Sequence, residues 1–167
     1  MKKHVFVSAL AVLLAIAVLF AACAKSQKEF FDLTAEKSDY APGEELAVTV
    51  TLNNVENVAL FDLKVSFDPD VLTLTEAVEG DVDDFILMTN PKEGYVLVNG
   101  FCATTHDFTD ETVAVLYFTV NEGASGRIDL RSVATAFQIG TDDSGDETEE
   151  LVGQKDISAS LKLKAAG

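Results

Sequence analysis

Strict alternation of apolar and polar residues is the feature that most restricts how this chain can fold. From Glu45 to Leu52, the even positions are Leu46, Val48, Val50 and Leu52. From Ala59 to Phe67, the odd positions are apolar, and the positions between them are Leu60, Asp62, Lys64 and Ser66. Successive side chains of a β-strand point to opposite faces. Each segment therefore predicts a strand that buries one face and exposes the other.

Seven further segments have the composition of strands and are separated by Gly, Asn, Asp and Ser residues. They are residues 30–35, 71–77, 85–88, 95–102, 112–120, 127–133 and 157–163. No segment has a convincing helical period. About nine short strands at regular spacing predict an all-β sandwich of two sheets. Its expected core includes Val48, Val50, Phe61, Val65, Phe67, Leu116 and Phe118.

The segment from Gly140 to Glu150 is the least structured part of the sequence and is predicted to be a polar loop before the last strand. Its acidic residues are Asp142, Asp143, Asp146, Glu147, Glu149 and Glu150. Their spacing does not fit an EF-hand, which needs Gly at the sixth place and Glu at the twelfth. Two interpretations remain, a weak calcium site and a solvated acidic loop, and the composition favours the second.

The N-terminus has the three parts of a secretory signal. Lys2 and Lys3 are followed by an almost unbroken apolar stretch from Val5 to Ala22, and small residues precede Cys23. A cysteine directly after two alanines resembles the lipobox of bacterial lipoproteins, in which the thiol is acylated and the signal is removed. A transmembrane anchor is the alternative, because about 18 apolar residues are near the lower limit for a span.

The lipobox resemblance implies a division of the chain into three parts. Residues 1–22 are expected to be the signal peptide, residues 23–29 a short tether lipidated on Cys23, and residues 30–164 one folded domain. The lipid would replace a spanning helix as the anchor. We therefore expect an extracytoplasmic, membrane-anchored lipoprotein of the cell envelope.

Composition limits the partners of this domain. Without residues 1–22, the chain has 145 residues, 10 basic and 28 acidic side chains, and a net charge of −18. That length is sufficient for one domain with a hydrophobic core. The negative surface repels nucleic acid, so no nucleic-acid partner is expected. Cys102 is the other cysteine, and lipidation of Cys23 would leave it without a disulfide partner, as a small apolar side chain in a strand.

Several segments follow one another in the order found in cohesin domains. Tyr40-Ala41-Pro42-Gly43-Glu44 precedes the first alternating strand, and Phe67-Asp68-Pro69-Asp70-Val71-Leu72 closes the second. Residues 112–120 and 124–128 match the later part of that order. Over roughly residues 30–163, the chain therefore resembles the cohesin family. The resemblance implies a nine-stranded jelly-roll β-sandwich without catalytic activity, which binds dockerins, small calcium-loaded modules on other proteins.

The resemblance also assigns a binding face. Cohesins have a partner-binding Asp at the position that matches Asp62, and the alternation independently places Asp62 outside the core. The partner is expected to contact the exposed positions of this strand and of the strand beside it, which are Leu60, Asp62, Lys64, Ser66, Arg127, Asp129 and Arg131. No cofactor is expected in this chain, since any calcium would belong to the partner.

Two positions depart from the family pattern. Leu60 stands where cellulosomal cohesins usually have Asn, and the region Cys102-Ala103-Thr104 lacks the acidic residue usual there. Polar contacts of this kind set the choice of partner. The resemblance therefore predicts a protein-binding module whose partner is a diverged, dockerin-like module of another secreted or envelope protein.

Enzymatic activity is not expected. His106 is the only histidine after the signal, and it is predicted to be a surface loop residue beside Asp107. Neighbouring positions do not make a catalytic triad, because its groups must meet in space. No serine lies in a Gly-x-Ser-x-Gly turn.

Carbohydrate binding on the cell surface, with a polysaccharide as ligand, is the alternative function. Sandwich modules that bind sugars usually stack aromatic rings on them, and this chain has no Trp and three Tyr residues, Tyr40, Tyr95 and Tyr117. Tyr117 is expected on the outer face of its strand with Val113 and Val115, because Leu116, Phe118 and Val120 should face the core. This strip is either a small binding patch or a surface covered by the N-terminal segment.

The lipobox yields a testable prediction. Cys23→Ser should abolish lipidation, because the serine hydroxyl does not replace the acylated thiol, and the domain should then be released or the precursor left uncut. Mass spectrometry of the membrane-bound mature protein from a bacterial host measures the modification. An unmodified Cys23 in that protein would contradict the prediction.

Overall fold

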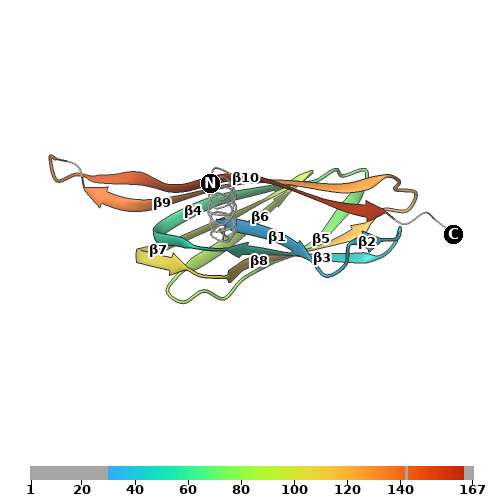
Figure 1. Cartoon of the computed structure of the whole chain (residues 1–167), viewed down its shortest axis with the longest axis horizontal. Coiled ribbons are helices and arrows are strands. Elements are labelled where there is room, and N and C mark those ends of the chain that lie inside the picture. The colour runs from blue at the N-terminus through green and yellow to red at the C-terminus, as the bar shows by residue number, and fades with distance from the viewer. Residues whose placement is uncertain (1–29, 142, 164–167) are drawn as a thin grey trace, which may run out of the picture.

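The computed structural model describes residues 30–141 and 143–163, which form ten strands and no helix (Figure 1). The strands are β1 (Phe31–Ala35), β2 (Asp39–Tyr40), β3 (Glu45–Leu52), β4 (Val55–Ser66), β5 (Leu72–Glu79), β6 (Ile86–Lys92), β7 (Tyr95–Phe108), β8 (Glu111–Val120), β9 (Arg127–Thr141) and β10 (Glu147–Leu163). The predicted signal peptide and tether lie outside the described residues. Within the described residues, no helix is long and apolar enough to cross a membrane.

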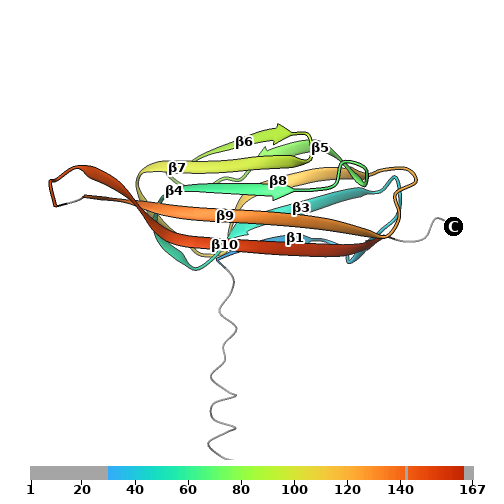
Figure 2. The same ribbon diagram turned by 90° about the horizontal axis from the view of Figure 1, so that it is seen from above.

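The strands form two sheets that pack face to face. One sheet has the order β1-β3-β8-β5, and the other has the order β2-β10-β9-β4-β7-β6. Neighbours are antiparallel except for β2 and β10, which are parallel. Figure 2 shows β7, β4, β9 and β10 side by side in the larger sheet. The predicted all-β sandwich is confirmed.

The core lies between the two sheets and contains the inward side of each alternating strand. Of the seven predicted core residues, six are at most 1% exposed: Val48, Val50, Phe61, Val65, Leu116 and Phe118. Phe67 is only partly buried, because β4 ends at Ser66, and its ring packs edge-on against Phe118 with centroids 5.0 Å apart. At the other end of the core, the Phe61 ring contacts those of Phe85 and Phe108, at 5.7 and 5.9 Å.

A tenth strand was not expected from the sequence. Asp39 and Tyr40 form β2, which pairs with the end of β10 through Lys162 and Leu163. Two residues are too few to show a period, so the pattern of the sequence does not reveal them. Tyr40 is 1% exposed, and its hydroxyl accepts a hydrogen bond from the backbone nitrogen of Lys37 at 3.1 Å.

The segment from Gly140 to Glu150 is not the predicted loop. β9 continues to Thr141 and β10 begins at Glu147, so the two strands form a long hairpin with a short turn around Gly145, whose φ is +85°. Because β4 pairs with β9 only as far as Phe137, the rest of the hairpin projects beyond the sandwich (Figures 1 and 2). Backbone pairing orders this segment despite its polarity, and Gln138 also donates to Glu150 at 2.7 Å.

Of the register shifts in the two sheets, one in β8 and one in β10 bear on the predicted faces. The pairing of β3 with β8 shifts between Val50 and Thr51, and the extra residue in β8 is Val113. A bulge interrupts the alternation of a strand. Val113 is therefore fully buried beside Ala114, and the prediction that it shares the outer face with Val115 and Tyr117 was wrong. The bulge in β10 lies between Leu151 and Gly153.

Truncating Phe61 should destabilise the fold strongly. Phe61→Ala removes a ring that is 1% exposed and contacts two other rings. The free energy of unfolding should therefore fall by about 3–5 kcal/mol. Urea denaturation followed by circular dichroism measures this change. The exposed Lys92→Ala is the control and should change the free energy of unfolding by less than about 0.5 kcal/mol. Equal stabilities of the two variants would contradict the described core.

Candidate partner-binding face

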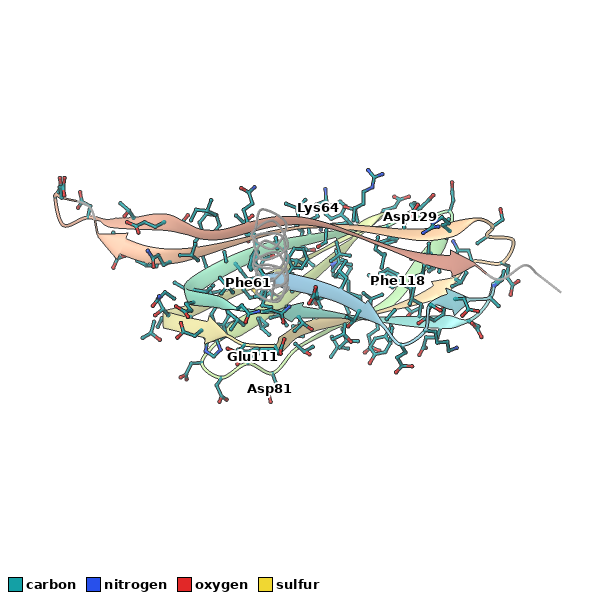
Figure 3. The ribbon with its side chains drawn as sticks, viewed as in Figure 1. Phe61, Lys64, Asp81, Glu111, Phe118 and Asp129 are labelled. Atoms are coloured by element: carbon teal, nitrogen blue, oxygen red, sulfur yellow. The ribbon has the colours of Figure 1, made fainter. Side chains whose placement is uncertain are left out.

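The outward side of the six-stranded sheet carries the residues that the sequence predicted as a binding face. In β4, Phe61, Leu63 and Val65 are at most 1% exposed, whereas Asp62 and Lys64 are exposed and Leu60 and Ser66 are partly exposed. Figure 3 shows Lys64 and Asp129 on the outer side of this sheet, away from Phe61 and Phe118 between the sheets. The alternation of β4 thus presents these four side chains on one surface.

β9 lies beside β4 and adds its odd-numbered residues to the same surface. Arg131 is opposite Ser66, and Thr135 is opposite Asp62. Arg127 and Asp129 are exposed on the same side, but they lie beyond the last residue of β4 that pairs with β9. Arg127 is eight residues from Thr135, about 26 Å along an extended strand. The structure therefore brings Arg131 next to the β4 residues and places Arg127 and Asp129 at the far end.

Two of the predicted side chains contact β7. Asn99 Nδ2 donates a hydrogen bond to the Asp62 carboxylate, and Asn99 is directly opposite Asp62 in the sheet. Lys64 Nζ lies over the Tyr95 ring, 4.4 Å from its centroid. These contacts orient both charged side chains on the open face. Such preorganisation lowers the entropy cost of binding.

An apolar row crosses the same face, and of its members the sequence predicted only Leu60. Leu60 is directly opposite Phe101 of β7 and Phe137 of β9. The row continues to Ile86 of β6, opposite Phe101, and to Leu151 of β10, opposite Phe137. Ile86, Phe101 and Leu151 are 57, 45 and 56% exposed. We call Ile86, Phe101, Leu60, Phe137 and Leu151 the apolar row.

Period two within β7 would have revealed part of this row. Val96, Val98 and Gly100 are buried, so Leu97, Asn99 and Phe101 must face outward. Gly100 fits because it lacks a side chain: a Cβ there would overlap the rings of Phe61 and Phe85. The contribution of Phe137 was hidden, because β9 was expected to end at Val133.

His106 and Cys102 do not form a catalytic arrangement. His106 lies in β7 rather than in the predicted loop, and its Nε2 is 2.7 Å from Glu111 Oε2. Asp107 instead accepts a hydrogen bond from the backbone of Asn57. Cys102 is partly buried, and its thiol donates to the backbone oxygen of Thr104. Burial raises the pKa of the Cys102 thiol.

The tyrosines that the carbohydrate interpretation requires are dispersed. Tyr40 is buried, and Tyr95 lies under Lys64. Tyr117 and Val115 line a hollow of about 340 Å³ on the outer side of the four-stranded sheet. Its other walls are Glu36, Lys37, Tyr40, Glu45, Ala47 and Thr49. The segment between β1 and β3 thus borders Tyr117. The described residues contain no group of three or more potential metal ligands.

Comparison with known proteins identifies the family of this fold. The family model of the cohesin domain matches residues 31–156. The chain belongs to the cohesin family. The cohesin resemblance predicted from the sequence is therefore confirmed, and the jelly-roll sandwich has ten described strands rather than nine. No curated protein matches the chain.

Solved cohesin structures share this fold at low sequence identity. The seventh ScaB type I cohesin from Pseudobacteroides cellulosolvens has a TM-score of 0.60 and 19% identity, over 83% of this chain and 95% of that one. A non-cellulosomal cohesin from the archaeon Archaeoglobus fulgidus has a TM-score of 0.54 and 16% identity, over 81 and 91% of the two chains. The Coh-OlpA–Doc918 cohesin–dockerin complex from Clostridium thermocellum gives a TM-score of 0.52 and 17% identity, over 81 and 100%.

The raised pKa of Cys102 predicts slow alkylation in the folded cohesin. Because the thiolate is the nucleophile, a raised pKa leaves less of the reactive form at pH 8 than in a free thiol. In the Cys23→Ser variant, iodoacetamide should therefore react more slowly with Cys102 of the folded protein than with Cys102 of the protein unfolded in urea. Mass spectrometry follows the reaction. Equal rates in both states would contradict the prediction.

Proposed function

We propose that this chain is a membrane-anchored, extracytoplasmic binding protein that captures a dockerin-like module of another protein. The outward side of the six-stranded sheet is the proposed binding face. Membership in the cohesin family supports a non-catalytic binding role. The Clostridium thermocellum relative was solved with a dockerin, which supports a partner of that class.

The observation that carries this proposal is the combination of apolar and charged side chains on one open face. Phe101 and Ile86 remain about half exposed at 45 and 57%, and the exposed Asp62 and Lys64 follow Leu60 on the same side of β4. Binding energy in protein interfaces concentrates in central apolar and aromatic contacts, with polar contacts around them. The apolar row would supply the buried contacts, and Asp62 would direct the choice of partner.

Leu60 gives this face a different chemistry from the one expected of a cellulosomal module. Its side chain cannot donate or accept a hydrogen bond. It lies between Phe101 and Phe137, so the centre of the face is apolar where the family resemblance implies a polar contact. A partner that buries a polar group at this point would leave that group unpaired, at a cost of about 1–3 kcal/mol. The proposed partner therefore presents an apolar side chain opposite Leu60.

Carbohydrate binding fits the arrangement less well. Stacking on a sugar needs exposed aromatic faces, and Lys64 already lies over the ring of Tyr95. The hollow beside Tyr117 is bordered by Glu36, Lys37 and Glu45, and it holds one partly exposed tyrosine. Phe101 is exposed, but its neighbours in the row are aliphatic or partly covered. The protein-binding function is therefore the one we propose.

Anchoring through Cys23 is part of the same proposal. It is supported by the lysines, the apolar stretch and the small residues that precede this cysteine. Cys23 is seven residues before Phe30, a span of at most about 25 Å in an extended chain. The captured protein would thus be held close to the membrane surface. A soluble or co-anchored partner suits this arrangement better than a large insoluble polysaccharide.

Replacing Asp62 tests the assigned face. Asp62→Ala should weaken capture of the true partner by about tenfold or more. Without the Asp62 carboxylate, the partner group that pairs with it would be buried in the complex without a charged contact. Protein stability should change little, since Asp62 is exposed. The exposed Glu45→Ala, on the outer side of the other sheet, removes the same charge and is the control.

Secreted and envelope proteins are passed over the immobilised protein with and without a calcium chelator, and a glycan array is run in parallel. For a dockerin-like partner, chelation should abolish capture, because the calcium belongs to the partner. Binding to glycans alone, with equal affinity for the wild type and Asp62→Ala, would refute the proposed function.

A further inference from the structure

The apolar row runs perpendicular to the strands and has a defined length. It spans five adjacent strands, β6, β7, β4, β9 and β10, and therefore four spacings between neighbours. At about 4.8 Å per spacing, its length is about 19 Å. Backbone groups within the sheet are already paired, so a ligand on this face is recognised through side chains. A helix of about 13 residues has the same length as the row.

The projecting hairpin continues this face beyond the sandwich. Ile139 follows Phe137 on the outward side of β9 and is 46% exposed. It pairs directly with Glu149 of β10, so both side chains lie on the face of the apolar row. Glu147 pairs with Thr141 one step nearer the tip. The outward surface thus changes from apolar at Leu151 to acidic at Glu149 and Glu147.

The bulge in β10 produces this arrangement. Gly153 pairs with Ala136 and Leu151 pairs with Phe137, so Val152 is the extra residue and packs partly against the core. In a regular ladder, Val152 would face outward, and Leu151, Glu149 and Glu147 would face the opposite side. The bulge therefore adds one apolar and two acidic side chains to the binding face.

The charged side chains of the hairpin are all acidic. From Ser132 to Gln154 the chain contains six acidic residues and no Lys or Arg. Arg131 and Lys64 lie on the opposite side of Asp62 along the strands. A partner that reaches the hairpin meets a negative surface, whereas one that reaches the start of β9 meets a mixed one. Complementary charge at the hairpin would therefore come from Lys or Arg.

We propose that the outward side of the β9–β10 hairpin belongs to the partner interface, and that the partner segment is an amphipathic α-helix with a basic end. Its apolar stripe would cover the apolar row across the strands. Its Lys or Arg side chains would lie against Glu149 and Glu147, the first of which is about 6.6 Å along β10 from Leu151. This inference rests on the proposed function, because it specifies the chemistry of the partner at the same face.

A second copy of this chain fits the face less well than such a helix. Without its signal each copy carries a net charge of −18, and two acidic hairpins would repel each other. A basic, apolar helix combines the two features that the face presents, and electrostatic complementarity also accelerates encounter.

Two synthetic helices test this inference. Both have about 18 residues and the same stripe of leucines at i, i+4, i+7 and i+11; one carries lysines at one end and the other carries glutamates there. Fluorescence anisotropy measures their binding to the purified protein at physiological salt. The basic helix should bind about tenfold more tightly than the acidic one.

Two matched charge-reversal variants locate the contact. Glu147→Lys with Glu149→Lys should weaken binding of the basic helix by about tenfold. Glu93→Lys with Glu122→Lys changes the net charge equally at exposed turns at the other end of the sandwich, and should weaken it by less than about threefold. Leu151→Ser should weaken binding of both helices. Circular dichroism confirms that each variant remains folded.

Three outcomes would overturn the inference: no binding of either helix, equal binding of both, or equal losses in the two charge-reversal variants. Equal losses would mean that the net negative charge of the protein attracts the basic peptide, without a specific contact at the hairpin. None of these outcomes bears on calcium-dependent capture of a dockerin-like module, so the proposed function can survive this failure. Conversely, the protein could bind the basic helix as expected but capture no dockerin-like module. That result would refute the proposed function and leave this inference standing.

Discussion

The packing of Phe61, Leu63 and Val65 between the two sheets is the constraint on which the rest of this structure depends. Each side chain is at most 1% exposed. Because neighbours along a strand point in opposite directions, their burial leaves Asp62 and Lys64 only the outer surface. A slip of one residue would bury both charges and expose the core, so the register of β4 is strongly fixed. The candidate binding face is thus determined by the same interactions that stabilise the domain, and β7 and β9 align their own outward residues with it.

How much of the fold the sequence predicts depends on how strongly a segment alternates. β3 was expected from Glu45 to Leu52 and has those bounds, since its even positions are all apolar. The segment from Gly140 to Glu150 was expected to be a loop, because acidic residues and glycines usually mark loops. Its order comes from the backbone pairing of two strands, which composition does not report. Val113 was misplaced for a related reason: a bulge in β8 shifts the alternation, and the local residues give no sign of it.

The part of the candidate site that lies on one alternating strand was predicted from the sequence. Leu60, Asp62, Lys64 and Ser66 share one strand, so a single period places them all on one side. The apolar row joins strands that are far apart in the chain, from Ile86 to Leu151, and its formation depends on the register between them. Arg127 and Asp129 show the opposite case: they lie on the expected face, yet β4 ends before it reaches them.

The position of Phe30 bears on how the domain would stand at a membrane. Its backbone oxygen accepts a hydrogen bond from the nitrogen of Asn53 at 2.7 Å, and its ring lies beside Gly153 of β10. The chain therefore enters the sandwich along the long edge formed by β1 and β10, rather than at one end (Figure 2). Under the proposed attachment through Cys23, the edge formed by β1 and β10 would face the bilayer, and the long axis of the domain would be parallel to the lipid surface. Both sheets would then be perpendicular to the bilayer, so the outer side of the six-stranded sheet would face sideways and stay open to a soluble or co-anchored partner.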